Sequence, residues 1–146
     1  MSLKAELNSR GLAPRKQWGQ HFLTDARILA SIAEAAELSA DDWVLEIGPG
    51  LGHLTRVLAT RAHVVAVEVD RGLAEKLHAE FAATPNVQII CGDALEKEPR
   101  EWIRAAAPTR AADDFQVVAN LPYYITSALL RHFLEATIKP RRIVVT

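Results

Sequence analysis

The stretch from Glu46 to Gly52, Glu-Ile-Gly-Pro-Gly-Leu-Gly, decides the fold class. It follows an apolar run, 43–47, that predicts a strand, and it precedes a helical pattern over about 53–60. Such a loop lies where open α/β sheets bind ligands. Its spacing is G-x-G-x-G, so the third glycine falls one residue earlier than in the dinucleotide pattern. The loop therefore favours an adenosyl cofactor without a pyrophosphate, with a purely structural turn as the alternative.

The rest of the chain alternates strand patterns with helical patterns, which is typical of parallel βαβ units. The expected strands are 43–47, 63–69, 87–91, 115–119 and 142–145, and the expected helices are 25–38, 53–60, 71–83, 99–106 and 125–136. The apolar face of the first helix is expected to carry Ile28, Leu29, Ile32 and Ala36. We therefore expect an α/β fold with a Rossmann-like domain over 25–146, preceded by a basic arm over 1–24.

Composition excludes several classes of protein. A chain of 146 residues with a net charge of −1 is a single domain with no overall excess of positive charge for nucleic acid. The lone Cys91 cannot form an internal disulfide, and no apolar run is long enough for a membrane helix or a secretory signal. We expect a cytoplasmic protein. Residues 1–27 carry five basic and two acidic side chains, and this arm either tracks phosphates or is simply solvated.

Acidic side chains end the second and third expected strands. A carboxylate at the tip of the second strand can accept hydrogen bonds from both ribose hydroxyls. Strand alternation does not choose between Glu68 and Asp70; we assign Glu68 to ribose and Asp70 to capping the helix that begins at Arg71. Asp93 can accept a hydrogen bond from the amine of adenine, or it can serve a turn. Together the strand tips predict one cleft for a nucleoside.

The most specific motif is Asn120-Leu121-Pro122-Tyr123, directly after the fourth strand. The exocyclic nitrogen of adenine is a poor nucleophile, and two acceptors, the Asn120 side-chain oxygen and the Leu121 carbonyl, can hold its hydrogens. Pro122 fixes the backbone that presents that carbonyl. Tyr123 offers a face on which an extruded base stacks, and its ring can stabilise positive charge. The catalytic work is then mostly alignment.

From about Lys16 to its last residue, the chain resembles the ribosomal RNA adenine N6,N6-dimethyltransferases, which have the Class I S-adenosylmethionine-dependent methyltransferase fold. The resemblance rests on five motifs in family order: KQWGQHFL at 16–23, EIGPGLGHLT at 46–55, VEVD at 67–70, GDA at 92–94 and NLPYY at 120–124. Leu121 favours the small-subunit branch, because the macrolide-resistance branch, which acts on large-subunit rRNA, more often has isoleucine there.

The resemblance implies S-adenosylmethionine as the cofactor and adenine of small-subunit (16S-type) rRNA, in an immature subunit, as the substrate. It implies that Gln20, His21 and Leu23 close over the cofactor, that Gly48 and Gly50 approach its methionine part, that Glu68 binds the ribose and Asp93 the adenine, and that Asn120 lies between cofactor and target base.

The family fold also has seven strands and a helical C-terminal domain for rRNA. Only five strands are expected here, so we expect a sheet truncated after 142–145, without that RNA-binding domain. A terminal strand left open at a sheet edge is prone to pairing. Exchange of this strand between two copies would make a dimer.

Three other functions stay open: a ribosome-assembly factor in which methylation is secondary, a large-subunit rRNA methyltransferase of the macrolide-resistance type, and a methyltransferase for small molecules or DNA. The five histidines and single cysteine show no metal-ligand spacing, so we expect no metal. The acidic pairs 41–42 and 113–114 are expected to be solvated turns.

Overall fold

The computed structural model describes residues 23–107 and 110–146. One parallel five-stranded sheet has the order β3-β2-β1-β4-β5. Its strands are β1 (Trp43–Ile47), β2 (His63–Glu68), β3 (Val87–Cys91), β4 (Gln116–Ala119) and β5 (Arg142–Val145). The helices are α2 (Ala26–Ala35), α3 (His53–Ala59), α4 (Arg71–Glu80), α5 (Pro99–Ala106), the 3-10 helix η2 (Arg110–Asp113) and α6 (Tyr123–Glu135). The expected α/β class is confirmed.

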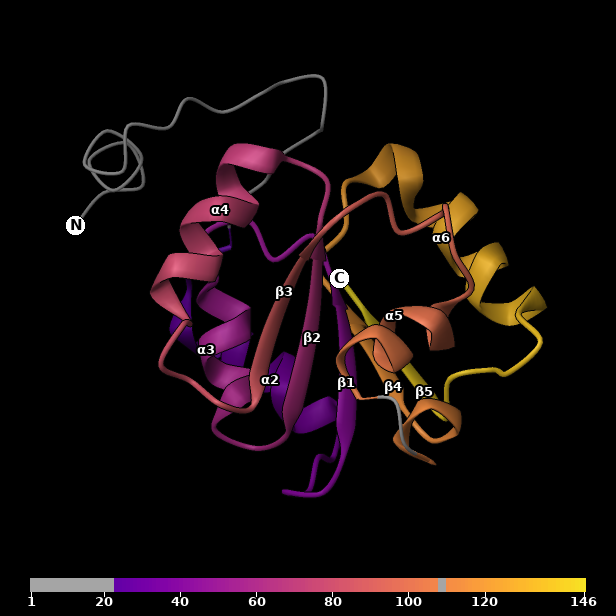
Figure 1. Ribbon diagram of the computed structural model, residues 1–146, viewed down its shortest axis with the longest axis horizontal. Coiled ribbons are helices and arrows are strands. Elements are labelled where there is room, and N and C mark those ends of the chain that lie inside the picture. Colours follow the sequence, from indigo (N-terminus) through magenta and orange to yellow (C-terminus); the bar gives the residue numbers. More distant parts are fainter. Residues whose placement is uncertain (1–22, 108–109) are drawn as a thin grey trace.

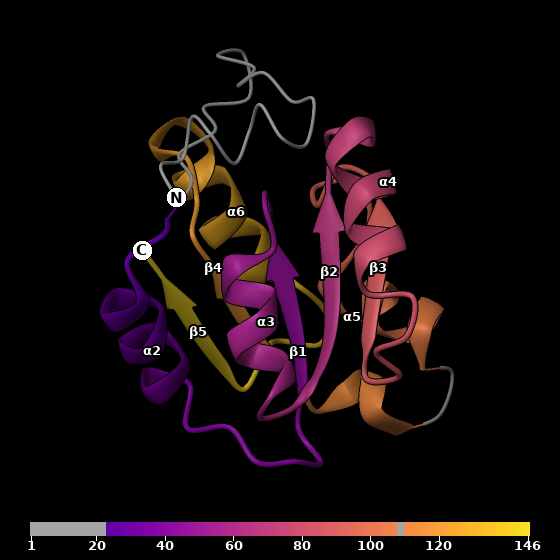
Figure 2. The same ribbon diagram turned by 90° about the vertical axis from the view of Figure 1, so that its left-hand side faces the viewer.

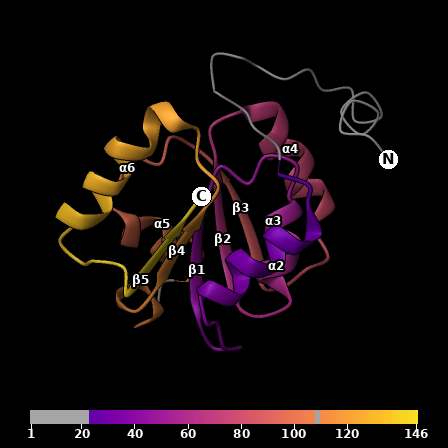
Figure 3. The same cartoon turned by 180° about the vertical axis from the view of Figure 1, so that it is seen from behind.

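The helices cover both faces of the sheet, as Figures 1 and 3 show: α2, α3 and α4 lie on one face, and α5 and α6 on the other. Strand alternation explains this, since successive side chains point to opposite faces. Val44 and Val64 pack with the first group of helices, while Leu45 and Val65 pack with the second. Two apolar cores therefore sandwich the strands, as a parallel sheet requires.

The boundaries of β1, β3, β5 and α5 match the sequence prediction, whereas three helix boundaries differ from it by two residues or more. Helix α2 ends at Ala35, because Glu37 takes a left-handed conformation with φ 49°. Helix α4 ends at Glu80. Helix α6 begins at Tyr123, because the extended backbone of Pro122 serves as its N-cap.

Two smaller expectations are wrong. Ile28 is 46% exposed, so the buried face of α2 is formed by Leu29, Ile32 and Ala33 instead, and the C-cap Ala36 is buried beside them. The acidic pairs are not simply solvated, because Arg141 binds both Asp42, at 2.8 Å, and Asp114, at 3.1 Å. Together the two bridges link the segments that precede β1, β4 and β5.

The strand order creates a switch point between β1 and β4. From β1 the chain moves outward through β2 to β3, and it then returns to pair β4 with the other side of β1. Because all strands are parallel, their carboxyl ends meet at one edge of the sheet, which is the upper edge in Figure 2. The glycine loop and the Asn120 motif therefore emerge side by side at the position where such sheets bind ligands.

Strand β5 forms one edge of the described sheet. Dimerisation through this edge stays a prediction. The division of the chain after residue 24 also stays a prediction, because residues 1–22 lie outside the described part.

Candidate active site

The glycine loop after β1 adopts a backbone that only glycine accepts easily. Gly48, Gly50 and Gly52 have φ angles of 67°, 60° and 80°, in the left-handed region. At Gly52 a Cβ would lie 2.7 Å from Cδ2 of Leu77 on α4, whereas at Gly48 it would meet no atom within 4 Å. The loop is therefore pressed against α4 at its far end and borders open space at its start.

Glu68, at the tip of β2, is buried and braces this loop. Its Oε2 accepts a hydrogen bond of 3.0 Å from the Gly50 nitrogen, and its Oε1 accepts one of 2.9 Å from the Asp70 nitrogen. Burial raises the pKa of the Glu68 carboxyl, although these two hydrogen bonds act in the opposite direction. The side chain assigned to ribose thus already holds two backbone groups.

Asp70 caps helix α4, as predicted. Its Oδ1 accepts hydrogen bonds from the nitrogens of Gly72, at 2.9 Å, and Leu73, at 3.2 Å. These bonds satisfy two backbone donors at the start of the helix. The capping role expected for Asp70 is therefore confirmed, and the assignment of Glu68 to ribose stays a prediction.

Asp93 follows β3 and is exposed. Its Oδ1 accepts a hydrogen bond of 2.9 Å from the Leu95 nitrogen. Asp93 therefore stabilises a turn, which was the alternative to binding adenine. The preceding Gly92 donates its N–H to the Glu68 carbonyl at 3.0 Å. A Cβ on Gly92 would lie 2.7 Å from Cη2 of the buried Trp102. The ring of Trp102 therefore packs closely against the backbone that carries Asp93.

Residues 120–122 connect β4 to α6, and Tyr123 is the first residue of α6. Oδ1 of Asn120 accepts a hydrogen bond of 3.0 Å from the hydroxyl of Thr146. Leu121 is buried, whereas the ring of Tyr123 is 92% exposed. The next ring, Tyr124, is 61% exposed.

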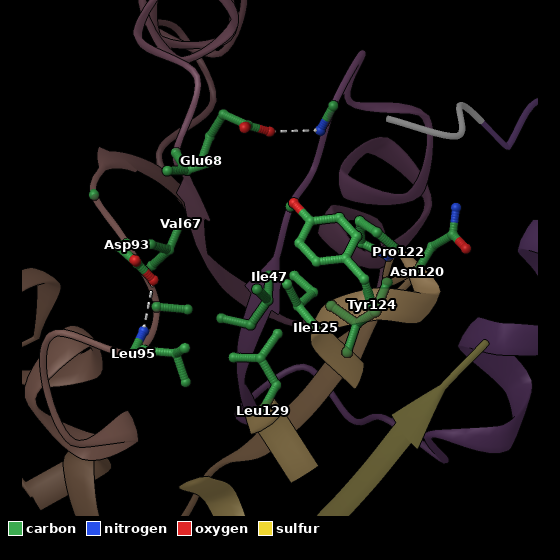
Figure 4. Close-up of a pocket in the computed structure, with 16 residues that line it drawn as sticks. Ile47, Val67, Glu68, Asp93, Leu95, Asn120, Pro122, Tyr124, Ile125 and Leu129 are labelled. Carbon is green, nitrogen blue, oxygen red and sulfur yellow. Dashed lines mark hydrogen bonds between the residues drawn. The ribbon is translucent and has the colours of Figure 1, made fainter. Parts of the chain in front are cut away.

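A cavity of about 270 Å³ lies between these elements. Figure 4 shows Glu68 and Asp93 on one side of it and Asn120, Pro122 and Tyr124 on the other. It is lined by Ile47, Gly48, Gly50, Val67, Glu68, Val69, Gly92, Asp93, Ala94, Leu95, Asn120, Leu121, Pro122, Tyr124, Ile125 and Leu129. The structure thus brings the tips of β1, β2, β3 and β4 to one hollow.

Two of the described residues that the sequence singled out, Tyr123 and Leu23, do not line this cavity. Tyr123 is absent from its lining, and Tyr124 takes a place there. Leu23 lies instead on a second, smaller cavity of about 30 Å³, which it shares with Gly48, Gly50 and Asn120. Gln20 and His21 lie outside the described residues.

Glu46 also borders this second cavity and is a site residue to which sequence reasoning gave no role. Its side chain is buried, and its Oε2 has no hydrogen-bond partner among the described residues. Burial, with a smaller contribution from the charge of Glu68, raises the pKa of Glu46 to about 8. The signal in the sequence was an acid within an otherwise apolar strand. Such a group suits a cationic ligand.

The fold and this site define the class of protein. The parallel sheet carries a glycine loop after β1 and polar groups at the tips of β2, β3 and β4. This arrangement is found in the S-adenosylmethionine-dependent methyltransferases. A family model described as ribosomal RNA adenine dimethylase matches residues 11–146. The chain belongs to this family.

The most similar proteins include two curated relatives named ribosomal RNA small subunit methyltransferase A. The one from Dehalococcoides mccartyi is 47% identical over 135 residues, which are 92% of this chain and 44% of that protein. The one from Moorella thermoacetica is 43% identical over 143 residues, 96% of this chain and 50% of that protein. The chain thus spans about half the length of the curated relatives it matches.

Two solved structures have the same arrangement. The crystal structure of the 23S rRNA methyltransferase ErmE superimposes with a TM-score of 0.71 at 39% identity, covering 86% of this chain and 48% of that one. A dimethyladenosine transferase from Plasmodium falciparum gives a TM-score of 0.67 at 26% identity, covering 86% of this chain and 42% of that one.

The described residues lack two further features. Over 23–107 and 110–146, no helix combines the length and apolar character needed to cross a membrane. Within the same ranges, no three His, Cys, Asp or Glu side chains form a group that could hold a metal ion.

Proposed function

We propose that the protein transfers methyl groups from S-adenosylmethionine to N6 of adenine in small-subunit rRNA, twice on the same nitrogen. The observation that carries the proposal is that Glu68, Asp93 and Asn120, which come from three strand tips, border one cavity. The carboxylate of Glu68 suits the ribose hydroxyls, the carboxylate of Asp93 suits the adenine amine, and the amide of Asn120 suits the amine that accepts the methyl group. The reaction belongs in the cytoplasm, with rRNA or the immature small subunit as partner.

The residues present suit the cofactor. Glu68 would hold the ribose hydroxyls and Asp93 the adenine amine, while Gly48 and Gly50 bring backbone close to the methionine part. The buried Oε2 of Glu46 has no hydrogen-bond partner among the described residues and lies beside the same glycines, so it suits the ammonium of that part. Gln20, His21 and Leu23 would close the site. S-adenosylmethionine supplies an electrophilic methyl on a sulfonium.

The acceptor side of the site aligns the target nitrogen. The oxygens of Asn120 and Leu121 hold the two amine hydrogens, so that the nitrogen lone pair points toward the methyl group. The peptide of Leu121 is itself held, because its N–H donates to the Thr146 carbonyl at 3.1 Å. The exposed ring of Tyr123 is accessible to a base extruded from RNA. The methylated ammonium is acidic and loses its proton without an early general base.

Two observations support small-subunit rRNA as the substrate. The curated relatives cited above carry that designation in their names, and Leu121 stands where the large-subunit branch more often has isoleucine. The similarity to a 23S rRNA methyltransferase makes large-subunit rRNA the competing substrate.

The test uses the full-length protein that contains these 146 residues. It is incubated with labelled S-adenosylmethionine and, separately, immature small subunits, large-subunit rRNA and free adenosine. The proposal expects N6,N6-dimethyladenine in the small-subunit RNA. Methylation of large-subunit RNA alone, or of free nucleoside alone, overturns the assigned substrate. A protein that binds small subunits without methylating them is an assembly factor instead.

A further inference from the structure

The residues that follow β3 form one wall of the cavity of about 270 Å³. We call residues 92–95 the adenine wall, because all four line the cavity and the proposed function assigns the cofactor's adenine to Asp93. Within the wall, Oδ1 of Asp93 accepts from the Leu95 nitrogen at 2.9 Å (Figure 4). The Asp93 carbonyl accepts from the Glu96 nitrogen at 3.0 Å. The turn is thus held internally, and its position relative to the sheet depends on contacts with other elements.

Trp102 on α5 touches the adenine wall on both sides of Asp93. The side chain is buried, at 3% exposed. Its Cη2 lies 2.7 Å from the point that a Cβ on Gly92 would occupy, and its Nε1 donates a hydrogen bond of 3.4 Å to the Ala94 carbonyl. Because that bond is long, packing of the ring supplies most of the contact. One buried ring therefore contacts both neighbours of Asp93.

The close approach of this ring explains why position 92 is a glycine. The φ angle of Gly92 is not in the left-handed region, unlike those of the three glycines in the loop after β1. Its backbone conformation therefore does not demand glycine. A Cβ at this position would also lie 3.3 Å from Cζ3 of Trp102. The ring and the wall fit together with no room for a methyl group between them.

Trp102 is itself firmly placed, so it can serve as a reference for the wall. Helix α5 begins with a capping box between Glu98 and Glu101, which satisfies backbone donors at its first turn. The neighbouring Ile103 is fully buried in the same core. The ammonium of Lys97 lies over the indole, 4.8 Å from the ring centroid, and such a contact is attractive.

We propose that Trp102 is the positioning residue of the adenine wall: its ring fixes the backbone on both sides of Asp93 and so aligns that carboxylate with the amine of the cofactor's adenine. This inference rests on the proposed function, since it assumes that Asp93 binds adenine. Trp102 does not line the cavity, so it acts through the backbone of Gly92 and Ala94. Its effect on the cofactor is therefore specific to the base.

Two substitutions disturb the contact from opposite sides. Trp102→Phe removes Nε1 and the outer ring that carries Cη2. Gly92→Ala keeps the indole and adds a Cβ that points at it. Phe115→Leu is the matched control, because Phe115 is a fully buried ring in the same core that does not line the cavity.

The measurement is a titration of the full-length protein with S-adenosylhomocysteine and with its analogue in which hypoxanthine replaces adenine. Hypoxanthine has a carbonyl where adenine has the amine, so it cannot donate to Asp93. Wild-type protein should prefer the adenine ligand. Trp102→Phe and Gly92→Ala should each weaken the adenine ligand about 10-fold and leave the affinity for the analogue unchanged.

The control and the double variant separate positioning from general loss of stability. Phe115→Leu should lower the melting temperature, as Trp102→Phe also should, but it should keep the wild-type preference for adenine. In Gly92→Ala combined with Trp102→Phe, the loss of affinity for the adenine ligand should be smaller than the sum of the single losses, because the smaller ring leaves space for the Cβ.

The outcomes distinguish this inference from the proposed function. A wild-type preference for adenine that is unchanged in Trp102→Phe or in Gly92→Ala overturns the positioning role and leaves the proposed function intact. Equal weakening of both ligands also overturns the positioning role, since the effect is then not specific to the base. Wild-type protein that binds both ligands equally overturns the assignment of Asp93 to adenine, and the role of Trp102 with it.

Discussion

Oε2 of Glu68 accepts a hydrogen bond of 3.0 Å from the backbone nitrogen of Gly50, which joins the tip of β2 to the glycine loop after β1. Two of the groups proposed to hold the cofactor are therefore coupled before any ligand arrives. The other oxygen of Glu68 accepts from the Asp70 nitrogen at 2.9 Å. The carboxylate thus fixes the relative positions of the loop and the start of α4.

Glu68→Gln should weaken S-adenosylmethionine binding about 10-fold to 100-fold. An amide has one acceptor oxygen, so its NH₂ group would face one of the two backbone N–H donors. Titration calorimetry on the full-length protein measures the change. Glu75→Gln, at an exposed acid on α4, is the control and should bind normally. Unchanged affinity in Glu68→Gln would show that Glu68 is only a structural brace.

Because the pKa of Glu46 is raised, we expect the stability of the ligand-free protein to depend on pH. This pKa is raised from 4.5 to about 8 in the folded protein, so the folded state keeps a proton that the unfolded chain releases. The resulting stabilisation is fully present below pH 4.5 and is lost as the pH rises to about 8. Denaturant unfolding across this range should show the loss in the wild type and not in Glu46→Gln. Parallel curves for the two proteins would contradict the shifted pKa.

We also expect the Glu46 carboxyl to release its proton when the cofactor binds. A cationic ammonium placed beside Glu46 favours its ionised form. Calorimetry at neutral pH in two buffers of different ionisation enthalpy should therefore reveal a released proton with S-adenosylmethionine. Glu46→Gln should release none. Equal proton release from both proteins would place the ammonium elsewhere.

A matched pair of alanine substitutions separates the two ends of the glycine loop. Gly48 and Gly52 both have left-handed φ angles, so each substitution costs about 1–2 kcal/mol of strain. Only at Gly52 does the new Cβ also clash with Leu77, which adds about 1–3 kcal/mol.

Gly52→Ala should therefore lower the melting temperature more than Gly48→Ala does. Gly48→Ala should instead weaken cofactor binding, because its Cβ would project into open space beside the cavities. Thermal unfolding and titration of both variants test this difference. The interpretation fails if Gly48→Ala binds the cofactor normally.

Of the two consecutive tyrosines, Tyr123 and Tyr124, we expect the ring of Tyr123 to stack on the target base. Tyr123→Ala should leave stability unchanged, because the side chain is 92% exposed, and should lower rRNA methylation about 10-fold to 100-fold through lost stacking. Tyr123→Phe should retain activity. Leu134→Ala, at another exposed apolar position on α6, is the control. Loss of transfer in Tyr124→Ala, with Tyr123→Ala active, would assign the stacking to Tyr124 instead.

The shared cavity could be predicted from the sequence because a parallel sheet forces strand tips to one edge. Apolar runs bounded by turn residues located β1, β3 and β5 to the residue. The end of α2 was missed, because the residue in left-handed conformation there is Glu37 and not a glycine. Local sequence carries little signal for such a turn.

Long-range pairings could not be predicted. The contacts between Glu68 and Gly50, and between Thr146 and Asn120, depend on strand register and on side-chain direction. Alternation places both Glu68 and Asp70 on one face, but only the folded chain shows that Asp70 is engaged in capping. The exposure of Tyr123 follows from α6 beginning at that residue, two residues earlier than the helical pattern indicated.

The most direct test of the central claim is to measure cofactor binding and methyl transfer separately in full-length Asn120→Ala. The account predicts wild-type affinity for S-adenosylmethionine and no N6,N6-dimethyladenine in small-subunit rRNA, since the cofactor is held by groups on β1, β2 and β3 while the amine is held after β4. Methylation by Asn120→Ala at the wild-type rate would contradict it.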